Sequence, residues 1–313
     1  MTRCPKKVLV TGAGGFIGSR LVRQLLASPA FAGAQFILND VKLEEFSHPR
    51  VRCVVGDLAS SELLDAIADV DTVYHLAGIL GGAAEANYAL SRRVNLDSTM
   101  TLLERLRDLP SVPRVVFASS IAVFGPPLPA AIRDQTIPHP TMVYGAQKRM
   151  IEIAVEQFSL RSWIDGIAIR LPGIVARRDA DERMKTAFLH SVFFAIEAGR
   201  DFVLPVAPDG TTWLISVQAC VNAFEHAGLL DQEALAQTRI FTLPAQFVRI
   251  HELVSAIQAE FPASTSKISY DPDPALVAQF TSNPPLTTEG ADALGFVHDG
   301  NLATLVRRAL DAE

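Results

Sequence analysis

KVLVTGAGGFIG, residues 7–18, is the stretch that decides the fold of this 313-residue chain. A short aliphatic run is followed by three glycines at three-residue intervals and then by an apolar segment of helical period. Such glycines permit a tight turn and a close approach of the backbone to a pyrophosphate, and the helix N-terminus attracts its negative charge. The stretch predicts a dinucleotide site, the alternative being a glycine turn that binds nothing. The expected contacts are Gly12, Gly15, Phe16, Ile17 and Gly18.

The cofactor is indicated by Asp40, which ends the second predicted strand, 22 residues beyond Gly18. A carboxylate at this position accepts hydrogen bonds from both hydroxyls of an adenosine ribose and repels a 2′-phosphate. We therefore expect NAD rather than NADP, although Lys42 is near enough to weaken the preference unless it is simply solvated. An aspartate that only forms a turn is the alternative for Asp40.

Short β-branched runs alternate with segments of helical period along the first half of the chain. This alternation predicts βαβ units, and the nearly continuous apolar strands predict helices on both faces. The expected fold class is α/β, a Rossmann-type doubly wound parallel sheet with a smaller C-terminal portion. We expect an NAD-binding domain over 1–175 and a mainly substrate-binding portion over 176–313, of which about 216–245 returns to the sheet. The proline-rich stretch 120–141 is expected to be an ordered loop.

Composition excludes several classes of partner. A formal charge of -6 and 7% aromatic residues offer no basic face, so neither nucleic acid nor a membrane is an expected partner. Cys4, Cys53 and Cys220 are widely spaced and have no histidine cluster beside them, which predicts no metal site and fits a reducing compartment. With no leader and no apolar segment long enough to span a bilayer, a cytoplasmic location is expected.

A second chemical pattern is YGAQK, residues 144–148. Tyr144 and Lys148 are four residues apart in a helix expected over about 142–160, and therefore lie one turn apart on one face. A phenol is a poor base at neutral pH, but a nearby ammonium and an oxidised nicotinamide would stabilise the phenolate. We expect Tyr144 to take the proton of an alcohol as hydride leaves its carbon.

Ser120 completes the expected catalytic group, because it ends the strand RVVFASS at the edge of the sheet where ligands bind. Its hydroxyl would bond the substrate oxygen, whereas the rival Ser119 would contact the cofactor through its backbone. Taken singly, each residue has a structural explanation: Lys148 paired with Glu152, Tyr144 half-buried, and Ser120 in a turn. Their occurrence together favours catalysis.

These residues resemble the extended short-chain dehydrogenase/reductase family, which includes NAD-dependent epimerases and dehydratases. The likeness covers nearly the whole chain, and beyond TGAGGFIG and YGAQK it includes GDL, HLAG, VNLDST, ASSIAVFG and RLPGIV. It implies that Asp57 and Leu58 contact the adenine, that Ala77 and Gly78 line the central part of the cofactor, and that Pro172 and Ile174 meet the nicotinamide. Further expected cofactor contacts are Asn95, Ser119, Tyr144 and Lys148, of which Lys148 would hold the nicotinamide ribose.

Three of the family positions have structural alternatives. Asp57 would be a helix N-cap ahead of Ser60. Asn95 would be a buried amide that ties backbone together, which is the interpretation we favour. His75 lies in a predicted strand and is expected to be a packed core histidine rather than a catalyst.

Departures from the family pattern bear on the substrate. Nucleotide-sugar enzymes of the family carry Asn where this chain has Gly173, and Tyr-Gly-Pro where it has residues 175–177. That Asn serves the nucleotide diphosphate. Its absence, together with Arg177 and Arg178, implies a smaller anionic substrate whose carboxylate an arginine would bind. An exposed arginine pair with no specific role is the alternative.

Longer stretches, among them LAGILGGAAEANYALSRRVNLDST and WLISVQACVNAF, resemble the D-erythronate dehydrogenase subgroup. This likeness implies oxidation of the C2 hydroxyl of a small sugar acid to the 2-keto acid, with Trp213 either walling the substrate pocket or packed in the core. A nucleotide-sugar epimerase or dehydratase and a non-catalytic NAD-binding regulatory protein remain open. Relatives pair through helices equivalent to those expected over 83–109 and 142–160, which implies a homodimer.

Overall fold

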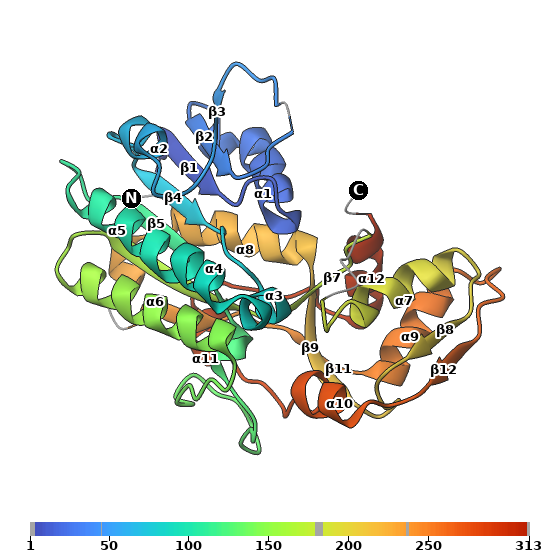
Figure 1. The fold of residues 1–313 in the computed structure, drawn as a ribbon. Coiled ribbons are helices and arrows are strands. Elements are labelled where there is room, and N and C mark those ends of the chain that lie inside the picture. Colours follow the sequence, from blue (N-terminus) through green and yellow to red (C-terminus); the bar gives the residue numbers. More distant parts are fainter. Residues whose placement is uncertain (1–3, 45, 179–183, 236–237, 312–313) are drawn as a thin grey trace. The chain divides into compact units, whose positions relative to one another are not determined.

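The computed structural model describes residues 4–44, 46–178, 184–235 and 238–311 (Figure 1). The chain forms two compact units, each assembled from three segments. The first unit comprises Met1–Val123, Pro140–Arg170 and Val221–Phe241. The second comprises Phe124–His139, Leu171–Cys220 and Thr242–Glu313.

The first unit is built on a seven-stranded sheet in the order β10-β6-β5-β4-β1-β2-β3, whose strands β1 to β5 pair in parallel. Its strands are β1 (Lys7–Thr11), β2 (Gln35–Asp40), β3 (Val51–Val55), β4 (Thr72–His75), β5 (Arg114–Ser120), β6 (Asp165–Leu171) and β10 (Ile240–Thr242). The strand order reverses between β1 and β4, so the loops after these strands meet at the edge where ligands bind in such sheets. The predicted Rossmann-type fold is confirmed.

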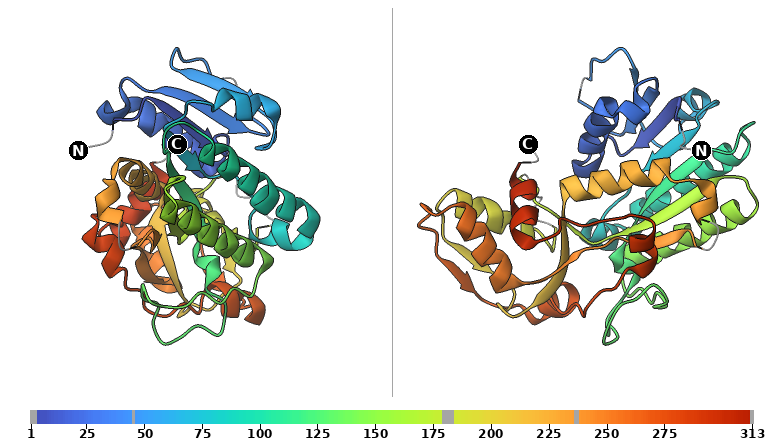
Figure 2. Two further views of the ribbon diagram at one scale, coloured as in Figure 1. Left: turned by 90° about the vertical axis from the view of Figure 1, so that its left-hand side faces the viewer. Right: turned by 180° about the vertical axis from the view of Figure 1, so that it is seen from behind.

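Helices cover both faces of this sheet, as the apolar strands predicted (Figures 1 and 2). On one face, α2 (Ser61–Ala66), α5 (Thr99–Arg107) and α6 (Val143–Leu160) share an apolar core with the strands. On the other, α1 (Phe16–Ala27) is joined to α8 (Val217–Leu229) by a 2.6 Å hydrogen bond from Gln24 to Glu225. The shorter elements are α3 (Gly81–Ala86), α4 (Tyr88–Arg92), a π-helical segment Arg93–Ser98, and 3-10 turns at Pro29–Phe31, Ile121–Val123 and Gln232–Leu235.

The second unit contains two small sheets. In the three-stranded sheet, β9 (Thr211–Ser216) lies between β7 (Gly173–Val175), which is parallel to it, and β11 (Gln246–Arg249), which is antiparallel. The two-stranded sheet pairs β8 (Phe202–Leu204) with β12 (Ile268–Tyr270). Its helices are α7 (Phe188–Glu197), α9 (Ile250–Glu260), α10 (Pro274–Phe280), α11 (Glu289–Ala293) and α12 (Leu302–Leu310).

The sequence predicts a main domain over 1–175 with a return of about 216–245, and the compact units of the structure can be set beside that prediction. The first unit ends its β6 segment at Arg170, and Val221–Phe241 is the part that returns to it. The proline-rich segment Phe124–His139 belongs to the second unit, because its backbone bonds there: Ile132 donates to the carbonyl of Pro285 at 2.9 Å. Prolines mark such a loop, but the sequence does not show which unit pairs with it.

None of the helices in the described ranges combines the length and the apolar character needed to cross a bilayer.

Candidate active site

The turn between β1 and α1 is tight because it contains two glycines that no other residue replaces without strain. Gly12 has a φ of +68°, and a Cβ there would lie 2.7 Å from the backbone nitrogen of Ala77, just beyond β4. A Cβ at Gly18 would collide with the carbonyl oxygen of Gly12. Helix α1 begins at Phe16 with no acidic residue in its first turn, so its backbone N–H groups remain available to an anion. This backbone cradle fits the pyrophosphate of a dinucleotide.

Asp40 lies beside this turn at the end of β2. One carboxylate oxygen accepts a hydrogen bond from the backbone N–H of Gly14 at 3.0 Å, and the other accepts from that of Lys42 at 3.4 Å. Lys42 itself is exposed. The carboxylate therefore stands at the edge of the glycine turn, where the ribose interpretation requires it, and it also makes the local turn bond of the alternative interpretation.

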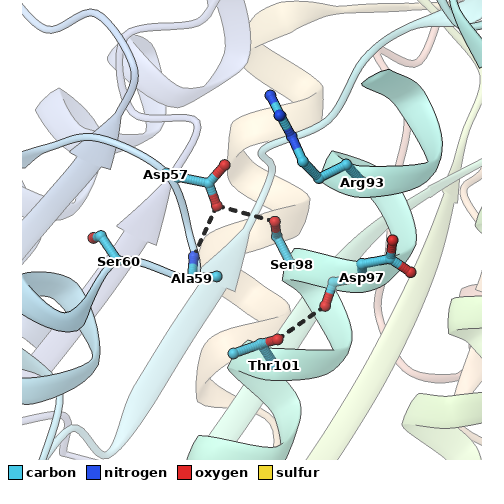
Figure 3. Close-up of a pocket in the computed structure, with 7 residues that line it drawn as sticks. All are labelled: Asp57, Ala59, Ser60, Arg93, Asp97, Ser98 and Thr101. Atoms are coloured by element: carbon cyan, nitrogen blue, oxygen red, sulfur yellow. Dashed lines mark hydrogen bonds between the residues drawn. The ribbon is translucent and has the colours of Figure 1, made fainter. Parts of the chain in front are cut away.

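Asp57 lines a surface pocket of about 340 Å³ in the first unit (Figure 3). Its Oδ1 accepts hydrogen bonds from the backbone of Ala59 at 2.9 Å and from the Ser98 hydroxyl at 3.0 Å. The N-cap of α2 is Ser60, so Asp57 is not the cap. Leu58 is packed into the core of the first unit, so its side chain gives the predicted adenine contact no support. The pocket is lined by Asp57, Ala59, Ser60, Arg93, Asp97, Ser98 and Thr101.

The three predicted catalytic residues are brought together at the carboxyl end of β5. The Ser120 hydroxyl lies close enough to the Tyr144 phenol to oppose the rise in its pKa, and the Oγ of Ser120 accepts a hydrogen bond from the backbone N–H of Ala122 at 3.1 Å. The Nζ of Lys148 lies 5.7 Å from the centre of the Tyr144 ring and donates to the carbonyl of Ala118 at 2.7 Å. A phenol, a hydroxyl and a buried ammonium therefore share one site.

Gly145 allows this arrangement. A Cβ at Gly145 would collide with the carbonyl oxygen of Ala122, so only glycine lets the first turn of α6 press against the loop that follows β5. This close approach brings Tyr144 beside Ser120. The sequence analysis did not single out Gly145, although a glycine next to a candidate catalytic residue is a signal that it contained.

The expectation that Lys148 and an oxidised nicotinamide together stabilise the phenolate concerns the protein with its cofactor, whereas the pKa values below describe the protein alone. Burial raises the pKa of Tyr144 to about 12, and the hydrogen bond with Ser120 only partly opposes this. Burial lowers the pKa of Lys148 to about 8, and the charge of Glu152 opposes that change. The amine is directed to a backbone carbonyl rather than to the phenol oxygen, so desolvation dominates at Tyr144. In the protein alone, the phenol is protonated at neutral pH.

The structure separates the two rival serines. The hydroxyl of Ser119 donates to Glu152 at 2.6 Å and is buried, whereas the hydroxyl of Ser120 contacts Tyr144. The oxygens of Glu152 are also bound by Arg170 at 2.8 and 2.9 Å. Lys148 makes its hydrogen bond to a backbone carbonyl instead, so the structural explanation of Lys148 as the ion-pair partner of Glu152 is wrong.

Asn95 has a structural role. Its Oδ1 accepts from the backbone N–H of Ile79 at 2.7 Å, and its Nδ2 donates to the Ile79 carbonyl at 3.0 Å and to Gln147 at 2.7 Å. These bonds fix the loop after β4 against α6. This is the structural role that the sequence analysis favoured for Asn95, and the loop that it supports contains Ala77 and Gly78.

His75 is a packed histidine, as expected. Its two ring nitrogens bond the hydroxyls of Thr11 at 2.7 Å and Thr99 at 3.0 Å. Burial, followed by the nearby charge of Lys148, lowers the pKa of His75 to about 3, so the ring is neutral. His75 therefore joins β1, β4 and α5 beneath the site.

In the second unit, the residues predicted to contact substrate or nicotinamide lie in different surroundings. Trp213 is only 1% exposed and its indole N–H donates to the carbonyl of Pro284 at 2.8 Å, which is the packing expected of the core alternative. Arg178 is paired with Glu197 at 2.8 Å and stacks on Phe194. Pro172 is buried and Ile174, in β7, is half-buried.

Arg177 differs from its neighbour. It is half-buried, and among the described residues its guanidinium has no acidic partner. Its backbone N–H donates to Nδ1 of His190 at 3.3 Å. Burial and the charge of Arg177 lower the pKa of His190 to about 4, so this ring is neutral. A half-buried cation beside a neutral imidazole fits an anionic ligand. The sequence analysis did not identify His190, and no motif marks it.

Comparisons with known proteins agree with this geometry. The model of the family described as "NAD dependent epimerase/dehydratase family" matches residues 8–225. The chain is 33% identical to D-erythronate dehydrogenase of Cupriavidus necator, over 97% of this chain and 98% of that protein. It is 32% identical to D-erythronate dehydrogenase of Haemophilus influenzae, over 97% and 99%. A crystal structure described as a nucleoside-diphosphate-sugar epimerase from Agrobacterium tumefaciens superimposes with a TM-score of 0.89 at 27% identity, covering 99% of this chain and 94% of that one.

Proposed function

Because the chain belongs to the NAD-dependent epimerase/dehydratase family and is a dehydrogenase acting on hydroxyl groups, we propose that it oxidises the C2 hydroxyl of a small sugar acid resembling D-erythronate. The product is the 2-keto acid. The observation that carries this substrate class is the match with two D-erythronate dehydrogenases along 97% of the chain, which includes the second unit.

Arg177 supports an anionic substrate independently of the relatives. Arg177 is half-buried beside the neutral ring of His190, surroundings in which a guanidinium binds an anionic group well. A carboxylate is the natural partner, because a guanidinium binds it with two parallel hydrogen bonds. Gly173 stands where nucleotide-sugar enzymes carry the Asn that serves a diphosphate, which favours the smaller acid.

The proposed cofactor is NAD, held by the backbone of the glycine turn and by Asp40 at the adenosine ribose. Asp57 and its pocket in Figure 3 would take part of the adenine end. When bound, oxidised NAD supplies a positively charged nicotinamide that accepts the hydride from C2 and favours an anionic phenol. The negative charge of Asp40 disfavours the 2′-phosphate of NADP.

The proposed proton path runs through two hydroxyl groups. With oxidised NAD bound, Tyr144 would first lose its own proton to solvent, and the resulting phenolate accepts the proton of the C2 hydroxyl. Ser120 hydrogen-bonds the same substrate oxygen and orients it. One alcohol thus loses a hydride and a proton and becomes a ketone. Lys148 contributes positive charge beneath the phenol and, by its bond to Ala118, is held in place to do so. In the reverse direction, the protonated phenol donates to the ketone oxygen.

A nucleotide-sugar epimerase or dehydratase is the second candidate, because the Agrobacterium tumefaciens structure matches nearly the whole chain. It would use the same Tyr144, Lys148 and Ser120. A non-catalytic NAD-binding regulatory protein is a weaker alternative, since the chain keeps a phenol, an ammonium and a hydroxyl in contact at the expected edge of the sheet.

The test is the formation of NADH at 340 nm by purified protein supplied with NAD and separate substrates. The panel contains D-erythronate, L-threonate, longer sugar acids, UDP-glucose and dTDP-glucose. Turnover of a sugar acid, with none on the nucleotide sugars, is expected. Turnover of nucleotide sugars alone would replace the proposal by the second candidate. Tight NAD binding without any turnover would favour the regulatory protein.

We also propose a homodimer in a reducing compartment such as the cytoplasm. Helix α6 exposes Met150, Ile153 and Leu160, whose spacing of three and seven residues places them on one face. A second copy of the chain would cover this apolar stripe. All three cysteines are free, which agrees with a reducing compartment. Sedimentation equilibrium at micromolar concentration tests the dimer, and a monomeric mass would contradict it.

A further inference from the structure

A buried cluster of charged groups lies directly behind the proposed catalytic residues. Glu152 is fully buried in α6, and its carboxylate accepts hydrogen bonds from Ser119 on β5 at 2.6 Å and from Arg149 on α6 at 3.0 Å. Arg170 on β6 binds both carboxylate oxygens, at 2.8 and 2.9 Å. Arg170 is itself only 5% exposed. One carboxylate thus joins two strands and a helix.

The position of this cluster links it to the proposed catalytic residues as well as to the core. Ser119 is the chain neighbour of Ser120, and Glu152 lies one helical turn beyond Lys148. Lys148 in turn donates to the carbonyl of Ala118, the residue before Ser119. The carboxyl end of β5 is therefore tied to α6 twice, once through Lys148 and once through Glu152. Ser120 follows immediately after both ties.

The cluster also sets the charges that Lys148 experiences. His75, which faces Lys148 from β4, is neutral, and Tyr144 on α6 is protonated. Arg149 and Arg170 are bound to Glu152 on its other sides. Glu152 is the group whose charge opposes the effect of burial on the pKa of Lys148, which settles at about 8. Without that negative charge, burial would lower the pKa of Lys148 further.

We propose that Glu152 is a positioning residue for the reaction: held by Arg170, it fixes the Ser119 end of β5 against α6 and keeps the ammonium of Lys148 charged at neutral pH. The proposal uses the roles given above to Ser120 and Lys148. Its first test nevertheless requires neither substrate nor cofactor, so it stands or fails separately from the proposed function.

The first test is an NMR titration of the protein labelled with ¹³C at lysine Cε, with the signal of Lys148 assigned by Lys148→Arg. In wild-type protein the midpoint of Lys148 is expected near pH 8. In Glu152→Gln, which keeps the shape and removes the charge, the midpoint falls by about 1 pH unit. The matched control is Glu156→Gln, one turn farther along the same helix, for which the midpoint stays unchanged. An unchanged midpoint in folded Glu152→Gln would overturn the electrostatic role.

The second test separates positioning from charge. Ser119→Ala removes the tie to β5 and keeps the carboxylate, so kcat is expected to fall about fivefold with KM and the Lys148 midpoint nearly unchanged. Glu152→Asp, which retains the charge on a shorter side chain, should keep the midpoint and lose kcat similarly. Wild-type kcat in both variants would overturn the positioning role. If Glu152→Gln does not fold, kcat of Ser119→Ala and of Glu152→Asp still tests the positioning role of Glu152.

Discussion

The first turn of α6 and the segment after β7 differ in how far the sequence alone predicts the surroundings of their polar side chains. In the first, Tyr144 and Lys148 lie one turn apart on one face of a helix, as the spacing of the motif predicted, and the amine of Lys148 is anchored on Ala118. In the second, the adjacent Arg177 and Arg178 look equivalent in the sequence, yet only Arg178 has an acidic partner among the described residues. The position of Tyr144 relative to Lys148 follows from local helical spacing, whereas the different surroundings of Arg177 and Arg178 arise from contacts with residues farther along the chain.

The largest effect on activity is expected for Tyr144→Phe, which tests whether the first turn of α6 carries the chemistry. Removing the phenol oxygen removes the proton acceptor and leaves the cofactor cradle intact, so kcat should fall by about 10³-fold or more. NAD affinity, measured by calorimetry, should stay within about twofold of wild type. A variant with near-full activity would show that the motif on α6 does not carry the chemistry.

Gly12→Ala tests the cradle of the first unit. The positive φ and the predicted collision with the backbone at Ala77 predict a loss of NAD affinity of about 100-fold. Gly33→Ala is the matched control, because nothing lies within 4 Å of a Cβ at that position. Both affinities are measured by calorimetry. Equal NAD affinity in the two variants would contradict a backbone cradle at Gly12.

Arg177→Met and Arg178→Met test which of the two adjacent arginines in the second unit binds the substrate carboxylate. Arg177→Met should raise KM for the sugar acid about 30-fold with little change in NAD affinity, because it removes a charged hydrogen bond to the carboxylate. Arg178→Met should leave KM within about twofold, since its partners are Glu197 and Phe194. Steady-state kinetics at several ionic strengths measure both values. The reverse ranking would assign the carboxylate to Arg178.

Lys148→Met removes a charge that we propose to assist catalysis, and apart from the loss of rate it is expected to change the stability of the protein. The folded pKa of Lys148, about 8, lies below the ordinary value of 10.5, so the buried ammonium lowers stability below pH 8. Its removal should stabilise the protein by up to about 3 kcal/mol at pH 7, less the lost bond to Ala118. The gain should vanish as pH rises from 8 to 10.5. Thermal unfolding against pH measures it, and a pH-independent loss of stability would be the contrary result.

The same contrast between local spacing and long-range packing determines how much of the fold and of the candidate site the sequence could predict. The glycine turn, Asp40 and the α6 motif were accessible because backbone sterics and helical spacing act over a few residues. Leu58 was expected at the adenine, and Trp213 either at the wall of the substrate pocket or in the core. Both side chains are buried, and their apolar character alone does not distinguish a core position from a ligand contact. Asn95 supports the loop after β4 through hydrogen bonds to Ile79 and Gln147. The sequence does not show these partners, since Gln147 becomes a neighbour of Asn95 only in the folded chain.

The charge states were the least accessible part. The sequence places an amine one turn from a phenol, which predicts a lowered phenol pKa, whereas burial raises it in the folded protein. Burial is a property of the whole unit and not of the motif. Glu152 illustrates the same limit, because its partner Arg170 is 18 residues away and the helical spacing pointed to Lys148 instead.

The most direct test of the central claim is the fate of deuterium placed at C2 of D-erythronate. During turnover with NAD, deuterium should appear in the reduced nicotinamide, detected by mass spectrometry, and the rate should show a primary isotope effect in wild-type protein. Reduced nicotinamide that contains only protium, with deuterium retained in the oxidised product, would contradict oxidation at C2 beside Tyr144.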